Sequence, residues 1–152
     1  MLREAHRFAN RPVRLPDGLH WNAPSLLAES LAGIRAAAAG SELAGIGVDT
    51  WGVDYGLIDR DRRLLGLPFH YRDRRTEGMV ERAHELVSRA ELYGVTGIQT
   101  MSINTVFQLL AEPPAALEAA DRILLIADLL GLWLTGIAAN EVTAASTTGL
   151  LD

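Results

Sequence analysis

The order of elements along the sequence predicts an α/β fold in which a β-sheet with flanking helices is followed by a helical segment. Segments rich in β-branched and aromatic residues fall before about residue 70, with one helix among them, and helical patterns dominate residues 76–152. With 152 residues the chain can bury one core without disulfides or metals. A domain of about this size buries roughly 68–70% of its unfolded surface.

The first half of the chain is expected to supply the strands. Asn22 and Pro24 predict the start of a helix that carries one apolar stripe and ends at Gly40. Residues 59–63 are polar and predict a hairpin tip. The expected strands are residues 2–8, 19–21, 43–49, 53–59 and 64–69, of which the last three are adjacent in one sheet.

The second half is expected to be mostly helical. The apolar run 123–134 contains Asp128 and Gly131 and is shorter than the roughly 20 residues that cross a bilayer, so it predicts a buried helix. The other expected elements are a helix from Thr76 to about Ser88, a short turn at 90–93 closed by Gly94, a helix at 106–111 capped by Asn104 or Thr105, and a short helix at 115–120.

Composition excludes several functional classes. A net charge of −5 gives no basic surface for nucleic acid, and no segment predicts a membrane span. Cysteine is absent, which excludes thiol catalysis and cysteine zinc sites. The charged first residues do not resemble a signal peptide, so we expect a cytoplasmic protein. The four histidines are scattered without ligand spacing, which predicts no metal site.

The segment 45–55 is the first candidate for chemistry. Asp49 and Asp54 flank Trp51 and Gly52. Carboxylates at a strand end can accept hydrogen bonds from the hydroxyl groups of a sugar, or they can transfer protons. Trp51 offers a flat apolar face, and Gly52 allows a ligand to approach the backbone. The alternatives are that Asp49 caps a turn, Asp54 lies on a solvated strand face, Trp51 fills the core and Gly52 only permits the turn.

The second candidate is the charged loop 71–76. Arg72, Arg74 and Arg75 surround Asp73, and a guanidinium group suits the recognition of hydroxyl, carboxylate or phosphate groups. The alternative is a salt-bridged loop that leads into the following helix. Spacing alone does not separate the two interpretations.

These segments carry a resemblance over essentially the whole chain. Residues 46–55 resemble the substrate-side strand, turn and strand of the FGGY carbohydrate kinases, and within them the rhamnulokinases. The other similar segments follow in the same order at comparable spacing: 66–68, 71–76, 88–93, 97–99, Asn104 with Thr105, 134–136 and 144–148, and residues 2–8 are similar to an early strand of that family.

The resemblance implies a partial actin-like, ribonuclease-H-like domain, an incomplete N-terminal FGGY kinase domain over residues 1–152. It implies a kinase that transfers the γ-phosphoryl group of ATP, with Mg²⁺, to a ketose, L-rhamnulose in the rhamnulokinases, giving the 1-phosphate. By position, Trp51 and Gly52 resemble the sugar-pocket turn, and Tyr71, Arg72 and Asp73 resemble the second substrate-side motif. Asp49, Asp54 and Asn104 are weaker substrate-side candidates.

The family's glycine-rich phosphate loop, its general-base aspartate and its nucleotide domain have no counterpart in residues 1–152. We therefore expect no catalytic residue here, no tight binding of ATP or Mg²⁺, and no phosphorylation by this chain alone. Its partners would be a sugar substrate and the missing kinase segments, or a second copy through uncovered strand edges. The alternatives are a kinase for another ketose or deoxy sugar, or a non-catalytic remnant or interaction module.

Overall fold

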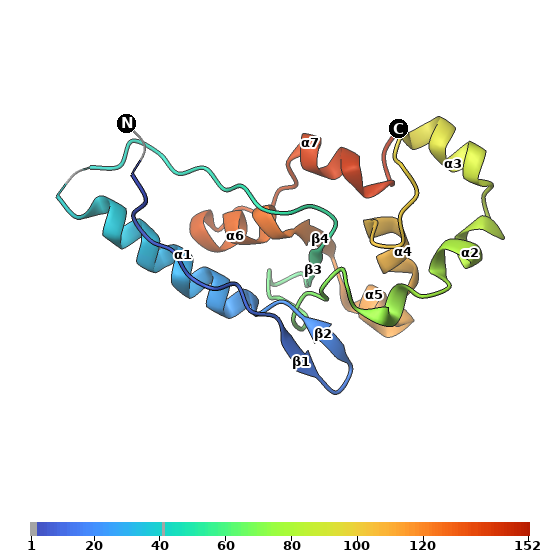
Figure 1. Ribbon diagram of the computed structural model, residues 1–152, viewed down its shortest axis with the longest axis horizontal. Helices are drawn as coiled ribbons and strands as arrows, with labels where there is room; N and C mark the ends of the chain where they lie inside the picture. The colour runs from blue at the N-terminus through green and yellow to red at the C-terminus, as the bar shows by residue number, and fades with distance from the viewer. Residues whose placement is uncertain (1–2, 41) are drawn as a thin grey trace.

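The structure, a computed structural model, describes residues 3–40 and 42–152. Two small antiparallel sheets organise them: β1 (Val13–Leu15) pairs with β2 (Gly18–His20), and β3 (Tyr55–Ile58) pairs with β4 (Arg122–Leu125). Figure 1 shows an elongated molecule in which α1 (Ala23–Ala38) lies on one side of the β3–β4 sheet and the small helices α2 to α5 on the other.

The helix α1 confirms the prediction from Asn22 and Pro24. The Asn22 side chain caps the helix by accepting a hydrogen bond from the Ser25 amide at 3.2 Å, and Pro24 lies in the first turn, where its missing N–H costs nothing. Gly40, at φ 86°, follows the helix end in the left-handed region that glycine adopts easily.

The β3–β4 sheet differs from the predicted three adjacent strands. Tyr55 lies opposite Leu125 and Ile58 opposite Arg122, so the partner of β3 comes from the predicted helix at 123–134. That helix, α6, spans only Ile126–Thr135 and ends at Gly136. The prediction of a helix from residue 123 was wrong because a short apolar run satisfies both a buried strand and a buried helix. The rest of the run is the buried helix that was expected.

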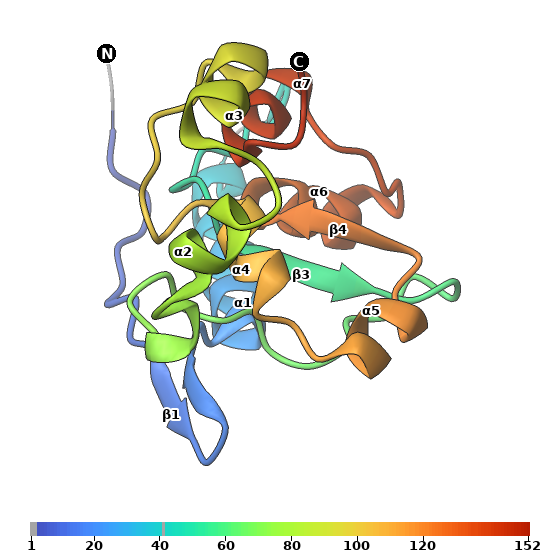
Figure 2. The same cartoon turned by 90° about the vertical axis from the view of Figure 1, so that its right-hand side faces the viewer.

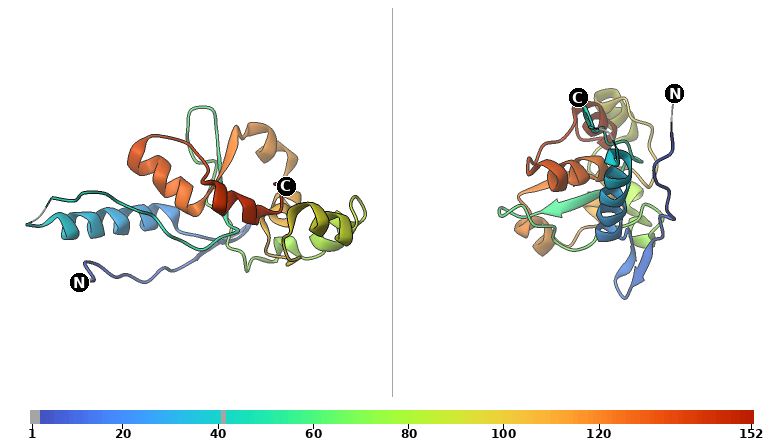
Figure 3. Two further views of the ribbon diagram at one scale, coloured as in Figure 1. Left: turned by 90° about the horizontal axis from the view of Figure 1, so that it is seen from above. Right: turned by 90° about the vertical axis from the view of Figure 1, so that its left-hand side faces the viewer.

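Two other predicted strands, 2–8 and 43–49, do not form within the described residues. Residues 3–8 and 43–49 are unpaired, and residue 2 lies outside the described residues. A strand needs a partner that completes its hydrogen-bond ladder. Residues 64–69 make only isolated bridges, from Leu64 to Ile58 and from Phe69 to His20. Figure 3 shows residues 42–50 running alongside α1.

The helical half also differs in detail. Thr76 does not cap a long helix: it lies in the 3₁₀ turn η1 (Arg74–Thr76), and α2 (Met79–His84) begins after Gly78, whose φ is 79°. The short turn that was predicted to close at Gly94 is part of a longer helix, which continues past Gly94 to Thr96. The remaining elements are α3 (Arg89–Thr96), capped by Ser88, then α4 (Thr105–Leu110) after Asn104, α5 (Pro114–Ala119), α7 (Val142–Ala145) and the 3₁₀ turn η2 (Ser146–Thr148).

The core lies between the β3–β4 sheet, α1 and α6. Ile58, Leu124 and Leu129 have no exposed surface, and Ala23 and Leu132 complete this cluster. Figure 2 shows β3 and β4 side by side in front of α6. No helix among the described residues has the length and apolar character needed to cross a membrane.

We expect the substitution Gly18→Ala to lower the free energy of unfolding by about 1–3 kcal/mol. A Cβ atom there would lie 2.9 Å from both Asp73 Oδ2 and Phe69 Cε1, and φ is 154°. Urea denaturation followed by circular dichroism measures the change. Gly45→Ala is the matched control, because nothing lies within 4 Å of its Cβ position. Equal stability of the two variants would contradict the expectation.

Candidate functional site

The candidate site is organised by a tight turn at residues 52–54, the Gly52 turn. The Asp54 amide donates to the Gly52 carbonyl at 3.0 Å, and this hydrogen bond makes Val53 the centre of a γ-turn. Val53 has a φ of 69°, a strained conformation for a β-branched residue. Such strain persists only where neighbouring groups hold it, and it is common at functional sites.

Asp54, the last residue of the turn, is fully buried and accepts hydrogen bonds that hold the turn in place. Its Oδ2 atom accepts hydrogen bonds from the indole N–H of Trp21 at 2.5 Å, from that of Trp51 at 3.0 Å and from the Tyr71 amide at 3.2 Å. Its Oδ1 atom accepts one from the Gln108 amide at 2.8 Å. Asp54 therefore ties together four separate segments of the chain, and it does not lie on a solvated strand face.

Burial raises the pKa of Asp54, and the hydrogen bonds from Gln108, Trp21, Trp51 and Tyr71 oppose this effect. A raised pKa is often a sign of a catalytic acid or base. Here both oxygens are occupied by protein donors and neither is exposed, so Asp54 orders the site and has no free oxygen for a substrate.

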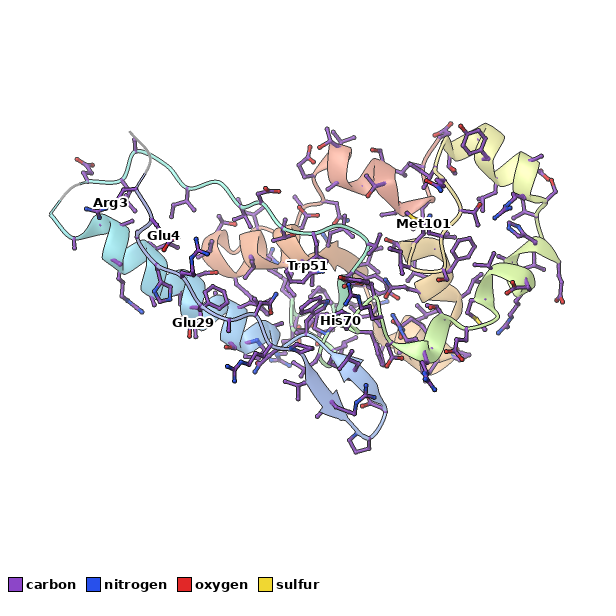
Figure 4. The ribbon with its side chains drawn as sticks, in the orientation of Figure 1. Arg3, Glu4, Glu29, Trp51, His70 and Met101 are labelled. Carbon is purple, nitrogen blue, oxygen red and sulfur yellow. The ribbon has the colours of Figure 1, made fainter. Side chains whose placement is uncertain are left out.

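Four aromatic rings pack above this carboxylate. The ring centroids of Trp21 and Trp51 lie 4.2 Å apart, those of Trp21 and His70 lie 4.0 Å apart, and those of His70 and Tyr71 lie 4.6 Å apart. Burial lowers the pKa of His70, which favours its neutral form within the stack. Figure 4 shows Trp51 and His70 close together at the centre of the molecule. Trp51 and Tyr71 remain half-buried.

The charged loop has mostly structural contacts. Asp73 Oδ2 accepts from the Leu19 amide at 2.7 Å and its Oδ1 from the Arg75 amide at 2.9 Å, so Asp73 connects β2 to η1. Arg75 forms an ion pair with Glu112 at 2.7 Å, and the two side chains are 11% and 5% exposed. Arg72 is exposed, and its guanidinium lies 5.4 Å from the centre of the Tyr71 ring.

A cavity of about 730 Å³, the turn cavity, opens beside the Gly52 turn. This volume is within the range of about 300–1,000 Å³ that is typical of small-molecule sites. Asp49, Trp51 and Gly52 line it on one side, while Asp128 of α6, with Glu141 and Thr147 from the α7 region, lines the other. The remaining candidates, Tyr71, Arg72, Asp73, Asp54 and Asn104, do not line this cavity.

Asn104 is buried, and its side-chain amide donates to the Gln99 carbonyl at 2.8 Å, so it fixes the loop before α4. Asp128 is also buried. Its Oδ1 accepts from the Glu141 amide at 3.2 Å, and its Oδ2 has no hydrogen-bond partner among the described residues. Burial raises the pKa of Asp128.

The turn cavity suits hydroxyl groups better than phosphate groups. Its charged lining consists of Asp49, Asp128 and Glu141, with no basic side chain, and carboxylates repel a triphosphate. No group of three or more potential metal ligands is arranged for a metal ion in residues 3–40 and 42–152. The residues of this cavity therefore do not fit ATP or Mg²⁺.

Sequence patterns did not reveal several residues of the site. Gln108, Trp21 and His70 support the turn, and Asp128, Glu141 and Thr147 line the cavity. One signal was present, because Asp128 is the only charged residue in the apolar run 123–134. The others come from segments whose proximity depends on the fold.

Comparison with known proteins shows that residues 20–152 match the N-terminal domain of the FGGY family of carbohydrate kinases. The chain is 40% identical to a rhamnulokinase of Bacteroides thetaiotaomicron over 155 residues and 43% identical to one of Enterococcus faecalis over 152 residues. Each alignment covers 99% of this chain and 32% or 31% of the relative. The chain thus spans about a third of the length of these relatives.

Solved structures share the fold. A gluconate kinase from Lactobacillus acidophilus superposes with a TM-score of 0.84 at 16% identity, covering 95% of this chain and 31% of that one. A xylulose kinase from the same organism gives a TM-score of 0.82 at 16% identity, with the same coverage. The actin-like, ribonuclease-H-like α/β fold that was expected from the sequence is confirmed by these neighbours.

Proposed function

Because the chain belongs to the FGGY family of carbohydrate kinases, we propose that it forms part of the sugar-binding half of an ATP-dependent kinase that converts L-rhamnulose to L-rhamnulose 1-phosphate. The observation that carries this proposal is the turn cavity, which Trp51 and Gly52 line together with three carboxylates. The substrate class is supported by the names of relatives that are about 40% identical over nearly the whole chain.

The chemistry of the cavity fits a polyhydroxylated ligand. The exposed carboxylate of Asp49 can accept hydrogen bonds from hydroxyl groups, whereas that of Glu141 is exposed but already caps α7 by accepting from the Thr143 and Ala144 amides. Trp51 offers an apolar surface for the C–H groups of a sugar, and its ring is held by Asp54 on one edge and Trp21 beside it. Gly52 has no side chain, which leaves its backbone open to the ligand.

In this proposal the phosphoryl donor lies elsewhere in the complete kinase. The family uses ATP with Mg²⁺, and phosphoryl transfer depends on cations that neutralise the charge of the phosphates. The acidic turn cavity supplies none of these groups. We therefore expect the 152-residue chain, assayed alone with ATP and L-rhamnulose, to release no ADP in a sugar-dependent manner.

We expect the chain to bind L-rhamnulose and the variant Gly52→Ala to bind it more weakly. A Cβ atom at Gly52 would lie 3.9 Å from its nearest neighbour, Thr147 Oγ1, so the substitution changes the cavity without straining the fold. One methyl group in the path of a ligand costs about 1–3 kcal/mol, or roughly 10- to 200-fold in affinity. Isothermal titration calorimetry gives the dissociation constants.

The matched control is Gly47→Ala, which is also open to solvent but lies outside the lining of the turn cavity. L-rhamnose, the aldose isomer, tests selectivity for the ketose. Equal binding of the two isomers would favour a different sugar. No heat of binding with any ketose or deoxy sugar would favour a remnant or an interaction module, and an unchanged dissociation constant in Gly52→Ala would remove Gly52 from the pocket.

A further inference from the structure

The strained Gly52 turn is held by a helix that no sequence motif connected to it. Thr105, the first residue of α4, is fully buried, and its hydroxyl donates to the Val53 carbonyl at 2.8 Å. Gln108, one turn later, donates to the same carbonyl at 3.3 Å and to Asp54 Oδ1 at 2.8 Å. Side chains of α4 therefore form hydrogen bonds with both Val53 and Asp54, the two residues of the turn that follow Gly52.

We propose that α4 is a positioning element for the sugar-binding turn, with Thr105 and Gln108 holding Val53 in its left-handed conformation. The role in sugar binding rests on the proposed function, whereas the clamp on the turn stands on the contacts alone. Neither side chain lines the turn cavity, so both act through the backbone of residues 52–54.

The physical reason is that Val53 does not adopt a φ of 69° unaided. Its β-branched side chain disfavours positive φ, so the free segment would relax toward extended backbone. The hydrogen bonds from α4 fix the Val53 carbonyl and oppose this relaxation. Relaxation would break the bond from the Asp54 amide to the Gly52 carbonyl and move Gly52 relative to the cavity. A pre-formed turn avoids this ordering cost when the ligand binds.

The informative variant is Thr105→Val, which removes the hydroxyl and keeps the shape of the side chain. Thr96→Val is the matched control: Thr96 donates in the same way to a backbone carbonyl, that of Leu92 at 2.8 Å, but within α3. Gln108 is left intact because it also accepts a hydrogen bond from Arg75. Amide hydrogen exchange measured by NMR and titration with L-rhamnulose supply two independent readouts.

In Thr105→Val we expect the Asp54 amide to exchange about fivefold faster or more, the factor that corresponds to one typical net hydrogen bond. The Leu65 amide, which donates to the Leu57 carbonyl of β3 at 2.8 Å, is the internal reference and should be unchanged. The dissociation constant for L-rhamnulose should rise by a similar factor of about five. Thr96→Val should change neither quantity.

A second substitution tests the role of strain. Glycine adopts positive φ freely, so Val53→Gly should preserve the turn, and Thr105→Val should have a smaller effect on affinity in the Val53→Gly background. Unchanged exchange at Asp54 in Thr105→Val overturns the clamp, as does equal acceleration at Asp54 and Leu65. Faster exchange at Asp54 alone, in a chain that binds no L-rhamnulose, supports the clamp and overturns the proposed function instead.

Discussion

Replacing Asp54 with alanine is expected to lower the free energy of unfolding by about 3–5 kcal/mol, because it leaves several buried donors without an acceptor. The indole N–H groups of Trp21 and Trp51 and the backbone amide of Tyr71 all donate to this carboxylate. Each buried group that loses its partner costs about 1–3 kcal/mol. The loss is a large fraction of the whole stability of a domain, which is about 5–15 kcal/mol.

The experiment is urea denaturation followed by the fluorescence of the tryptophans. Asp61→Ala is the control, since Asp61 pairs with Arg63 at 3.2 Å on the surface, where both side chains are mostly exposed. Such pairs contribute about 0–1 kcal/mol. If the two variants were equally stable, Asp54 would not organise the site.

Asp54→Asn tests the same carboxylate without creating a cavity. An amide side chain keeps one acceptor oxygen but presents an N–H₂ group where Gln108 already donates, so we expect a smaller loss of about 1–2 kcal/mol. Gln108 cannot simply rotate its amide, because its oxygen accepts a hydrogen bond from Arg75 at 3.1 Å. This variant should remain folded and allows the sugar titration to be repeated.

The same variant gives a test that depends on pH. Burial raises the pKa of Asp54 above the ordinary range of an aspartate, so the folded state holds the proton more tightly than the unfolded state. The stabilisation from this proton is complete below the unfolded pKa and is lost as the pH rises through the folded pKa. The stability advantage of the wild type over Asp54→Asn should therefore be larger near pH 4 than at pH 7.

The local signals in the sequence were sufficient for α1 but insufficient for β4. The cap at Asn22 and the following proline depend only on neighbouring residues, and the structure confirms both. In contrast, residues 123–125 become a strand because they pair with β3, more than sixty residues earlier in the chain. The apolar run contains no break that marks where the strand ends and α6 begins, so its pattern could not locate the boundary.

The candidate site, like the fold, was predicted from the sequence only in part. Trp51 and Gly52 were identified through the family resemblance, and they line the turn cavity on one side. The burial of Asp54 could not be predicted, because its four donors come from residues 21, 51, 71 and 108, which only the fold brings together. One interpretation of the sequence even placed Asp54 on a solvated strand face.

Arg75 provides the second large effect, and it separates a structural role of the charged loop from a role in ligand binding. Its guanidinium donates to Glu112 at 2.7 Å and lies 4.0 Å from the centre of the Phe69 ring. Only 5% of the Glu112 side chain is exposed, so Arg75→Met would leave a carboxylate buried without its cation. Breaking a buried pair in this way costs about 3–5 kcal/mol.

The double variant Arg75→Met with Glu112→Gln should recover much of this loss. It removes the unpaired charge, and the new amide oxygen can still accept the hydroxyl of Tyr55, which donates to Glu112 at 2.7 Å. Urea denaturation of the two single variants and the double variant forms a cycle that isolates the pair. Because neither residue lines the turn cavity, the double variant should bind L-rhamnulose as tightly as the wild type does. Weaker binding by a double variant of restored stability would instead place Arg75 among the residues that contact the sugar.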